Sequence, residues 1–157
     1  MRELNTRAER PIAAPAHRVW AYRLDFGNLP HYNPDVHGIT RTDAGVEGAH
    51  GAEYRFDLHA GGHVSPIVLR VTEAVPGELV AIEMDGALPA RERFTVTPGE
   101  VSAGGSAGCV AAIDLTLLIP DHFPAAHDDS LLAGGLTQII GELDRMKVIL
   151  EAADDRG

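Results

Sequence analysis

The sequence predicts an α+β domain in which a curved antiparallel sheet packs against one long C-terminal helix. Residues 36–119 alternate between short apolar stretches and turn residues, as consecutive strands joined by short turns do. Residues 129–154 carry apolar side chains at helical spacing on one broad face. A run of strands followed by a helix indicates α+β architecture, and consecutive strands with short connections form an antiparallel meander.

Length and composition indicate one soluble domain over residues 1–157. The chain is 45% hydrophobic and 23% charged, as ordinary globular proteins are. It has no apolar run of about 18 residues, so we expect no membrane insertion. The N-terminus has charges where a signal peptide needs its apolar segment, and Cys109 is the single cysteine. We therefore expect a cytoplasmic protein without a disulfide.

The net charge of −10 argues against a nucleic-acid partner, because binding to nucleic acid depends on clustered Lys and Arg. Lys147 is the single lysine, and the arginines are scattered. No phosphate loop, dinucleotide fingerprint or zinc-protease motif is present, so we expect no cofactor. The sequence leaves open whether the protein is a monomer or a homodimer.

The N-terminal part is predicted to hold one strand and two short helices. Residues 3–13 alternate weakly and indicate the strand. Pro15 suits the first turn of the following helix, which has Val19, Trp20, Tyr22 and Leu24 on its apolar side. A second short helix is expected at Leu29–Asn33 and is stopped by Pro34.

Alternation of apolar and polar residues predicts the strands that follow. Tyr54, Phe56 and Leu58 alternate with charged residues, a half-buried pattern. Turns are expected at Gly61-Gly62, Pro76-Gly77 and Pro98–Gly108. The remaining strands are expected at His63–Thr72, Leu79–Asp85, Arg91–Thr97 and Cys109–Ile119.

The long helix is predicted over about Asp129–Asp154, with Asp128, Asp129 and Ser130 suited to its start. A helix of this length spans on the order of 35 Å. Because the strands form a twisted sheet that curls, the helix is the element large enough to cover its concave face, and a cavity between the two is expected. The apolar face is Leu132, Leu136, Ile139, Ile140, Leu143, Met146, Val148 and Leu150.

The segment Ile12–Val36 resembles the opening of the START/Bet v 1-like superfamily, which includes bacterial polyketide cyclases and aromatases. The matching residues are Ile12, Ala14-Pro15, Val19-Trp20 and Leu29-Pro30. The order of elements also matches, so the resemblance covers essentially the whole chain. It implies a helix-grip fold with a hydrophobic pocket under the long helix. The pocket would hold one flat or elongated apolar molecule.

The same resemblance to the aromatase/cyclase branch implies polar pocket residues. It places a pocket arginine at Arg70, in the stretch IVLRVTEAVPG. The position of a pocket tyrosine falls on Val36, with Tyr32 one helical turn earlier, and that of an asparagine falls near Leu136.

Arg70 and Tyr32 are the candidate catalytic residues. In a regular strand Arg70 shares a face with Val64, Pro66 and Val68, which we expect to point inward. There it could stabilise developing negative charge. The alternative is that it pairs with Glu83 or Glu92, or extends to the end of the sheet. Tyr32 either donates a proton at the pocket mouth or closes one end of the core.

The remaining candidates are expected to line the cavity. Tyr54 faces inward by parity with Phe56, and Glu92 by parity with Phe94, where it could act as a base with a raised pKa or be exposed at the strand end. The expected ligand-binding residues are Tyr54, Phe56, Val68, Met84, Glu92, Phe94, Ile113, Leu136, Ile140 and Leu143.

Eight histidines raise the question of a metal site. His59 and His63 flank a Gly-Gly turn, and His122 and His127 lie in an acidic loop, which is usually a solvated arrangement. We expect no metal.

Two functional hypotheses remain. The protein is either a carrier that sequesters a small polyketide- or lipid-like molecule, or an enzyme that acts as a polyketide cyclase, aromatase or dehydratase. An unpaired Arg70 inside the cavity favours the enzyme, and a paired Arg70 outside it favours the carrier.

Overall fold

The computed structural model of the chain describes residues 1–42, 51–99 and 108–155. The predicted order of one strand, short helices, further strands and a long helix is confirmed. The turn expected at Pro98–Gly108 falls largely outside the described residues. The elements are β1 (Arg2–Ile12), α1 (Ala16–Leu24), η1 (Phe26–Asn28), α2 (Leu29–Tyr32), β2 (Val36–Arg41), β3 (Glu53–Ala60), β4 (His63–Val75), β5 (Leu79–Asp85), β6 (Ala90–Pro98), β7 (Cys109–Ile119), η2 (Ala125–His127) and α3 (Asp128–Asp155).

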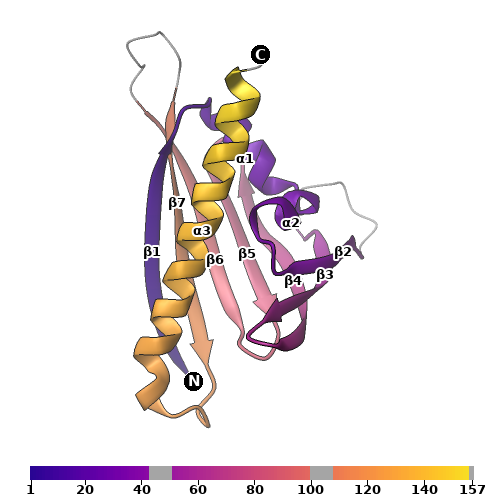
Figure 1. The fold of residues 1–157 in the computed structure, drawn as a ribbon, viewed down its shortest axis with the longest axis vertical. Coiled ribbons are helices and arrows are strands. Elements are labelled where there is room, and N and C mark those ends of the chain that lie inside the picture. The colour runs from indigo at the N-terminus through magenta and orange to yellow at the C-terminus, as the bar shows by residue number, and fades with distance from the viewer. Residues whose placement is uncertain (43–50, 100–107, 156–157) are drawn as a thin grey trace.

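The described strands form one antiparallel sheet in the order β1-β7-β6-β5-β4-β3-β2 (Figure 1). From β2 to β7 each strand pairs with its neighbour in sequence, which is the predicted meander. The last strand, β7, also pairs with the first strand, β1, along its whole length. Gly61 and Gly62 both have positive φ, at 58° and 78°, and make the tight turn between β3 and β4.

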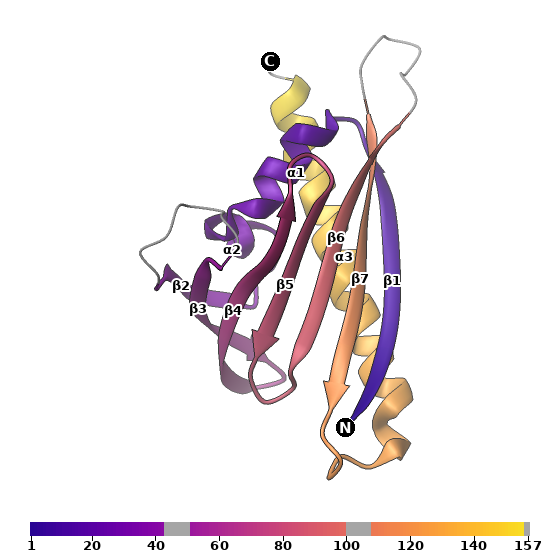
Figure 2. The same ribbon diagram turned by 180° about the vertical axis from the view of Figure 1, so that it is seen from behind.

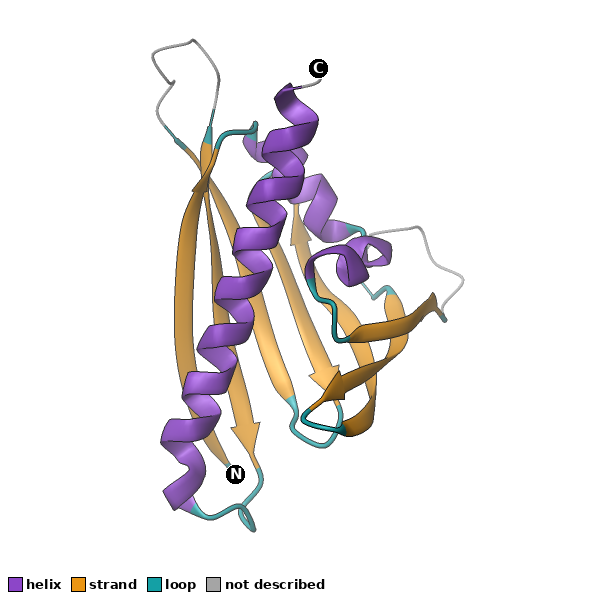
Figure 3. Ribbon diagram, viewed as in Figure 1, coloured by secondary structure: helices purple, strands orange, loops and turns teal. Residues whose placement is uncertain are grey.

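The helices lie on one side of the sheet (Figure 3), and in the view from behind the strands stand in front of α3 (Figure 2). Side chains on β6 and β7 alternate between the two faces of the sheet. Phe94 and Val96 on β6, with Ala111 and Ile113 on β7, are buried toward the helix side. The core therefore lies between the sheet and the helices, as in the predicted helix-grip fold.

The long helix α3 has 28 residues, so it is about 42 Å long. Asp128 and Asp129 lie in its first turn, where negative charge suits the helix dipole. Ile139, Leu143, Met146 and Leu150 repeat at three- and four-residue spacing and are buried. Val148 was predicted on this face, but it is 69% exposed because its direction on the helix is nearly opposite to that of Leu143.

No helix in the described part of the chain combines the length and the apolar character that a membrane span requires.

Candidate ligand-binding site

A cavity of about 300 Å³ lies between the concave face of the sheet and the N-terminal half of α3. Most of its wall is apolar, as is usual for sites that bind small molecules. Its lining comes from α1, η1, α2, the six strands β2 to β7 and α3. The apolar side chains of the wall include Phe56, Ile67, Leu69, Met84, Leu115 and Leu117.

The cavity reaches the protein surface beside α3. Ser130, Gly134 and Gln138 line the cavity, and all three are also exposed to solvent. They lie on one side of α3, since they are separated by four residues each. A ligand could therefore pass between this side of the helix and the strands that face it.

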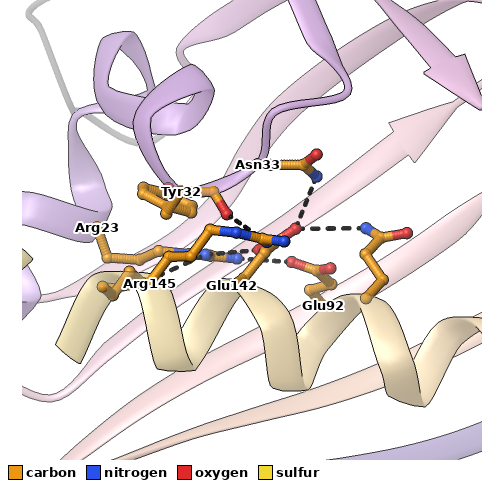
Figure 4. A network of polar contacts seen from close by, with 8 residues as sticks. Arg23, Tyr32, Asn33, Glu92, Glu142 and Arg145 are labelled. Atoms are coloured by element: carbon orange, nitrogen blue, oxygen red, sulfur yellow. Dashed lines mark hydrogen bonds and ion pairs between the residues drawn. The ribbon is translucent and has the colours of Figure 1, made fainter. Parts of the chain in front are cut away.

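At one end of the cavity three buried charged side chains meet (Figure 4). Arg23 from α1 donates from Nη2 to Glu92 Oε2 at 2.8 Å and from Nη1 to Glu142 Oε1 at 2.9 Å. Arg23, Glu92 and Glu142 are 1%, 3% and 2% exposed. They come from α1, β6 and α3, so the cluster joins three elements that are far apart in the sequence.

Regular secondary structure forces each of these charges inward. Arg23 lies one helical turn after the buried Val19. Glu92 lies two residues before the buried Phe94 on β6. Glu142 lies between Ile139 and Met146 on the buried face of α3. A side chain at any of these positions points to the core whatever its polarity.

Neighbouring amides and rings satisfy much of the remaining hydrogen-bonding capacity of the cluster. Asn33 Nδ2 donates to Glu142 Oε2 at 2.9 Å, and Gln138 Nε2 donates to the same oxygen at 3.3 Å. The Arg23 guanidinium also lies 5.2 Å from the centre of the Tyr32 ring and 5.3 Å from that of Phe94. Cations are attracted to aromatic faces at such distances.

Burial and, after it, the charge of Glu142 raise the pKa of Glu92 to about 7 against the opposing effect of Arg23. For Arg23, burial acts to lower the pKa, but Tyr32, Glu142 and Glu92 outweigh it, so the pKa lies above its ordinary value and Arg23 stays cationic. One guanidinium thus faces two carboxyl groups, and near neutral pH Glu92 can hold or release a proton.

One carboxylate oxygen of Glu92 has no hydrogen-bond donor among the described residues. Within the described residues, the Glu92 side chain accepts one hydrogen bond, from Arg23 to Oε2, and Oε1 accepts none. Glu92 also lines the cavity. Because Glu92 lines the cavity, this oxygen is available to a hydrogen-bond donor inside it.

Arg70 does not lie in this site, which corrects the sequence prediction. Its side chain is 46% exposed, and Nη1 donates to Asp85 at 2.8 Å, with Glu53 at 3.6 Å. Val68, predicted as a ligand contact, shares this outer face and does not line the cavity. The buried face of β4 is Ile67, Leu69 and Val71. Both faces of this stretch are apolar in sequence, so alternation alone could not tell which one points inward.

Tyr32 and Tyr54 are buried but do not line the cavity. Tyr32 is fully buried beneath the Arg23 guanidinium. Burial raises the pKa of its hydroxyl, which has no hydrogen-bond partner among the described residues. The carbonyl of Tyr32 accepts from Arg145 at 3.1 Å. Tyr54 packs against Phe26, with ring centres 5.7 Å apart.

Of the other expected contacts, Phe56, Met84 and Glu92 line the cavity. Phe94, Ile113 and Leu143 are instead buried in the core, outside the cavity wall. Leu136 and Ile140 are partly buried and also lie outside the wall. Helical geometry explains why, because both point to the side of α3 opposite to that of Gly134 and Gln138.

The sequence reasoning missed Arg23, Glu142, Asn33 and Gln138. A signal for two of them existed. Arg23 interrupts the apolar side of a short helix, and Glu142 interrupts the apolar face of the long one. A charge inside an amphipathic stripe needs a buried partner, and these two are partners of each other.

The described residues contain no group of three or more His, Cys, Asp or Glu side chains arranged to hold a metal ion. His37 and His59 stack with ring centres 4.0 Å apart on the exposed surface of β2 and β3.

Residues 3–151 match the family model described as polyketide cyclase/dehydrase and lipid transport. A search of curated protein sequences finds no match.

Solved structures with the same fold are numerous. A protein from Thermus thermophilus is 18% identical, with a TM-score of 0.78 over 96% of this chain and 99% of that one. A START superfamily protein from Mycobacterium smegmatis is 16% identical, with a TM-score of 0.75 over 95% and 98%. The Zhui aromatase/cyclase from Streptomyces sp. R1128 is 13% identical, with a TM-score of 0.72 over 96% and 94%. At these identities the similarity concerns the fold.

Proposed function

Since the chain belongs to the polyketide cyclase/dehydrase and lipid transport family of the START/Bet v 1-like superfamily, we propose that it binds one small hydrophobic molecule, polyketide- or lipid-like, in the cavity under α3. The observation that carries the proposal is the cavity itself. It is about 300 Å³ in volume, walled mainly by apolar side chains, and open to solvent beside Ser130, Gly134 and Gln138. Burial of apolar ligand surface there supplies the binding free energy.

The polar end of the cavity gives such a ligand its orientation. An apolar body would lie against Phe56, Leu69 and Met84, and its polar end would meet Glu92. A few polar groups placed in an apolar pocket usually fix which way a ligand lies.

A bulky side chain at Gly134 tests the proposal. A Cβ at Gly134 would meet no atom within 4 Å, so Gly134→Phe can extend into the cavity mouth without a backbone clash. The wild-type protein is expected to bind the neutral apolar dye phenylnaphthylamine, with a rise in dye fluorescence, and Gly134→Phe to bind it at least about tenfold more weakly. Thr137→Phe is the matched control, because Thr137 lies exposed on the same stretch of α3 but outside the cavity wall.

Thermal unfolding of both variants checks that the helix still forms. Equal dye affinity in the wild type and both variants would show that the dye binds elsewhere. An absence of dye binding by the wild type would count against a hydrophobic ligand site.

Glu92 favours a second candidate function, cyclisation or dehydration of a polyketide-like substrate. A carboxyl group with a pKa near 7 is suited to take and return protons at neutral pH. In a dehydration, Glu92 as carboxylate would take the proton from the carbon next to a carbonyl. The new C=C bond forms as the C–O bond of the β-hydroxyl breaks, and the same carboxyl returns the proton to the departing hydroxide as water.

Turnover separates the enzyme from the carrier. The β-hydroxy ketone made from benzaldehyde and acetone gains a conjugated double bond on losing water, which ultraviolet absorbance follows. An enzyme would accelerate this reaction, and Glu92→Gln would abolish the acceleration while the variant still binds the dye. If the protein binds the dye but does not accelerate the reaction, the result supports the carrier and contradicts the enzyme. The position of Arg70, paired with Asp85 outside the cavity, supports the carrier by the criterion given above.

A further inference from the structure

The charged end of the cavity contains several donor nitrogens, and each of those named here makes a hydrogen bond within the network. Both Nη atoms of Arg23 donate to the two carboxylates. Asn33 Nδ2 and Gln138 Nε2 both donate to Glu142. Each of these nitrogens belongs to a residue of the cavity wall and already makes at least one hydrogen bond inside the network.

The acceptors at this end also have unused capacity. Glu142 accepts hydrogen bonds at both carboxylate oxygens, from three side chains in total. Glu92 accepts one, at Oε2, so Oε1 remains without a partner within the described residues although the side chain is 3% exposed. Within the described residues the amide oxygen of Gln138 accepts no hydrogen bond from the protein, and Gln138 is exposed to solvent.

The formal charges of the cluster also favour a positively charged ligand group. With both carboxyl groups ionised, Arg23, Glu92 and Glu142 sum to −1 in a buried setting. The neutral amides of Asn33 and Gln138 donate to Glu142. The Tyr32 and Phe94 rings lie against Arg23. Arg145, a further cation drawn with this cluster in Figure 4, donates to the Tyr32 carbonyl and is exposed to solvent. A second negative charge brought to this end by a ligand would be repelled at low effective dielectric, whereas a positive one would balance the excess.

We propose that this end of the cavity recognises the hydrogen-bond-donating polar end of an otherwise apolar ligand, preferring a protonated amine to a hydroxyl and a hydroxyl to a carboxylate, with Glu92 Oε1 as the principal acceptor. This inference rests on the proposed hydrophobic site and adds the chemical class of its ligand. The amine gains a charge-assisted hydrogen bond, the alcohol gains a neutral donor, and the carboxylate would place an acceptor against an acceptor.

A series of ligands with one tail and three ends tests the ranking. Decylamine, decanol and decanoic acid share their alkyl chain, so differences in affinity report the polar end. Each is titrated as a competitor of phenylnaphthylamine at about pH 8, where most of Glu92 is ionised. Decylamine is expected to bind at least about tenfold more tightly than decanoic acid, with decanol between them.

Glu92→Gln tests the named acceptor, and Glu83→Gln is its matched control, because Glu83 lies exposed on the outer face of the neighbouring strand β5. In Glu92→Gln the preference for the amine over the acid should shrink by about tenfold or more, while Glu83→Gln should keep the wild-type ranking. Circular dichroism and thermal unfolding confirm that each variant is folded. If Glu92→Gln does not fold, the order of affinities for the three ligands measured on the wild-type protein decides whether the proposal holds.

The possible failures are distinct. If neither the dye nor any of the three ligands binds, the hydrophobic site itself is wrong. If the dye binds but the three ends bind equally, or the acid binds best, the site stands and the donor-recognising end is overturned. If the wild-type ranking is as expected but Glu92→Gln preserves it in a folded protein, Glu92 is not the acceptor and that assignment is overturned.

Discussion

At the scale of single residues, the structure depends on buried charges that lie on apolar faces. The alternation of strand β6 correctly indicates that Glu92 points inward with Phe94. The sequence could not show that Arg23 meets it, because the two residues are 69 positions apart and are brought together by the packing of α1 on the sheet. Pairing across elements is a property of the tertiary structure, which periodicity does not report.

The pKa of Glu92 predicts how stability depends on pH. Its folded-state pKa of about 7 lies above its ordinary value of 4.5, so the folded protein holds a proton that the unfolded chain releases. The free energy of unfolding should therefore fall as the pH rises from about 4.5 to about 7, by on the order of 3 kcal/mol from this group.

Glu92→Gln isolates this contribution. The amide does not ionise, so the difference in unfolding free energy between the wild type and the variant should change across this pH window and level off outside it. Urea unfolding at a series of pH values measures the difference. A constant difference from pH 4.5 to about 7 would mean that the folded-state pKa of Glu92 is not raised.

At the scale of the elements, α3 has two halves with different packing. Leu143, Met146 and Leu150 in the second half are fully or almost fully buried. The first half flanks the cavity and contains Gly134 and Gly135. Glycine inside a helix costs about 1 kcal/mol relative to alanine, and the cavity removes packing partners from this half. A bidentate contact from Arg2 to Asp128 holds the start of the helix to β1.

Hydrogen exchange should reflect this division. Amides of residues 130–138 are expected to exchange faster than those of 140–150, because local opening is easiest where fewer apolar contacts are lost. Saturation with a bound ligand should slow exchange in the first half selectively. Equal protection of both halves in the free protein would contradict an opening at the cavity mouth.

At the scale of the whole molecule, the fold was far easier to predict from the sequence than the site. The order of elements, the meander and the long terminal helix follow from periodicity and turn residues, and all three are confirmed. Strand β4 shows where this reasoning ends. Val64, Pro66 and Val68 on one face and Ile67, Leu69 and Val71 on the other are all apolar, so the inward face depended on packing against the rest of the sheet.

Replacing an arginine by methionine should therefore have very different effects on stability on the two faces of the sheet. Arg70→Met acts on the outer face, where the pairs with Asp85 and Glu53 are exposed to solvent and contribute little to stability. Arg23→Met acts on the inner face and leaves Glu92 and Glu142 buried without their cation, which typically costs about 3–5 kcal/mol. Urea unfolding of both variants measures the difference in stability, and phenylnaphthylamine titrations measure the difference in dye affinity.

Arg70→Met should keep wild-type stability and dye affinity. A loss of several kcal/mol or of dye binding in Arg70→Met, with little change in Arg23→Met, would mean that the inner and outer faces are assigned the wrong way round.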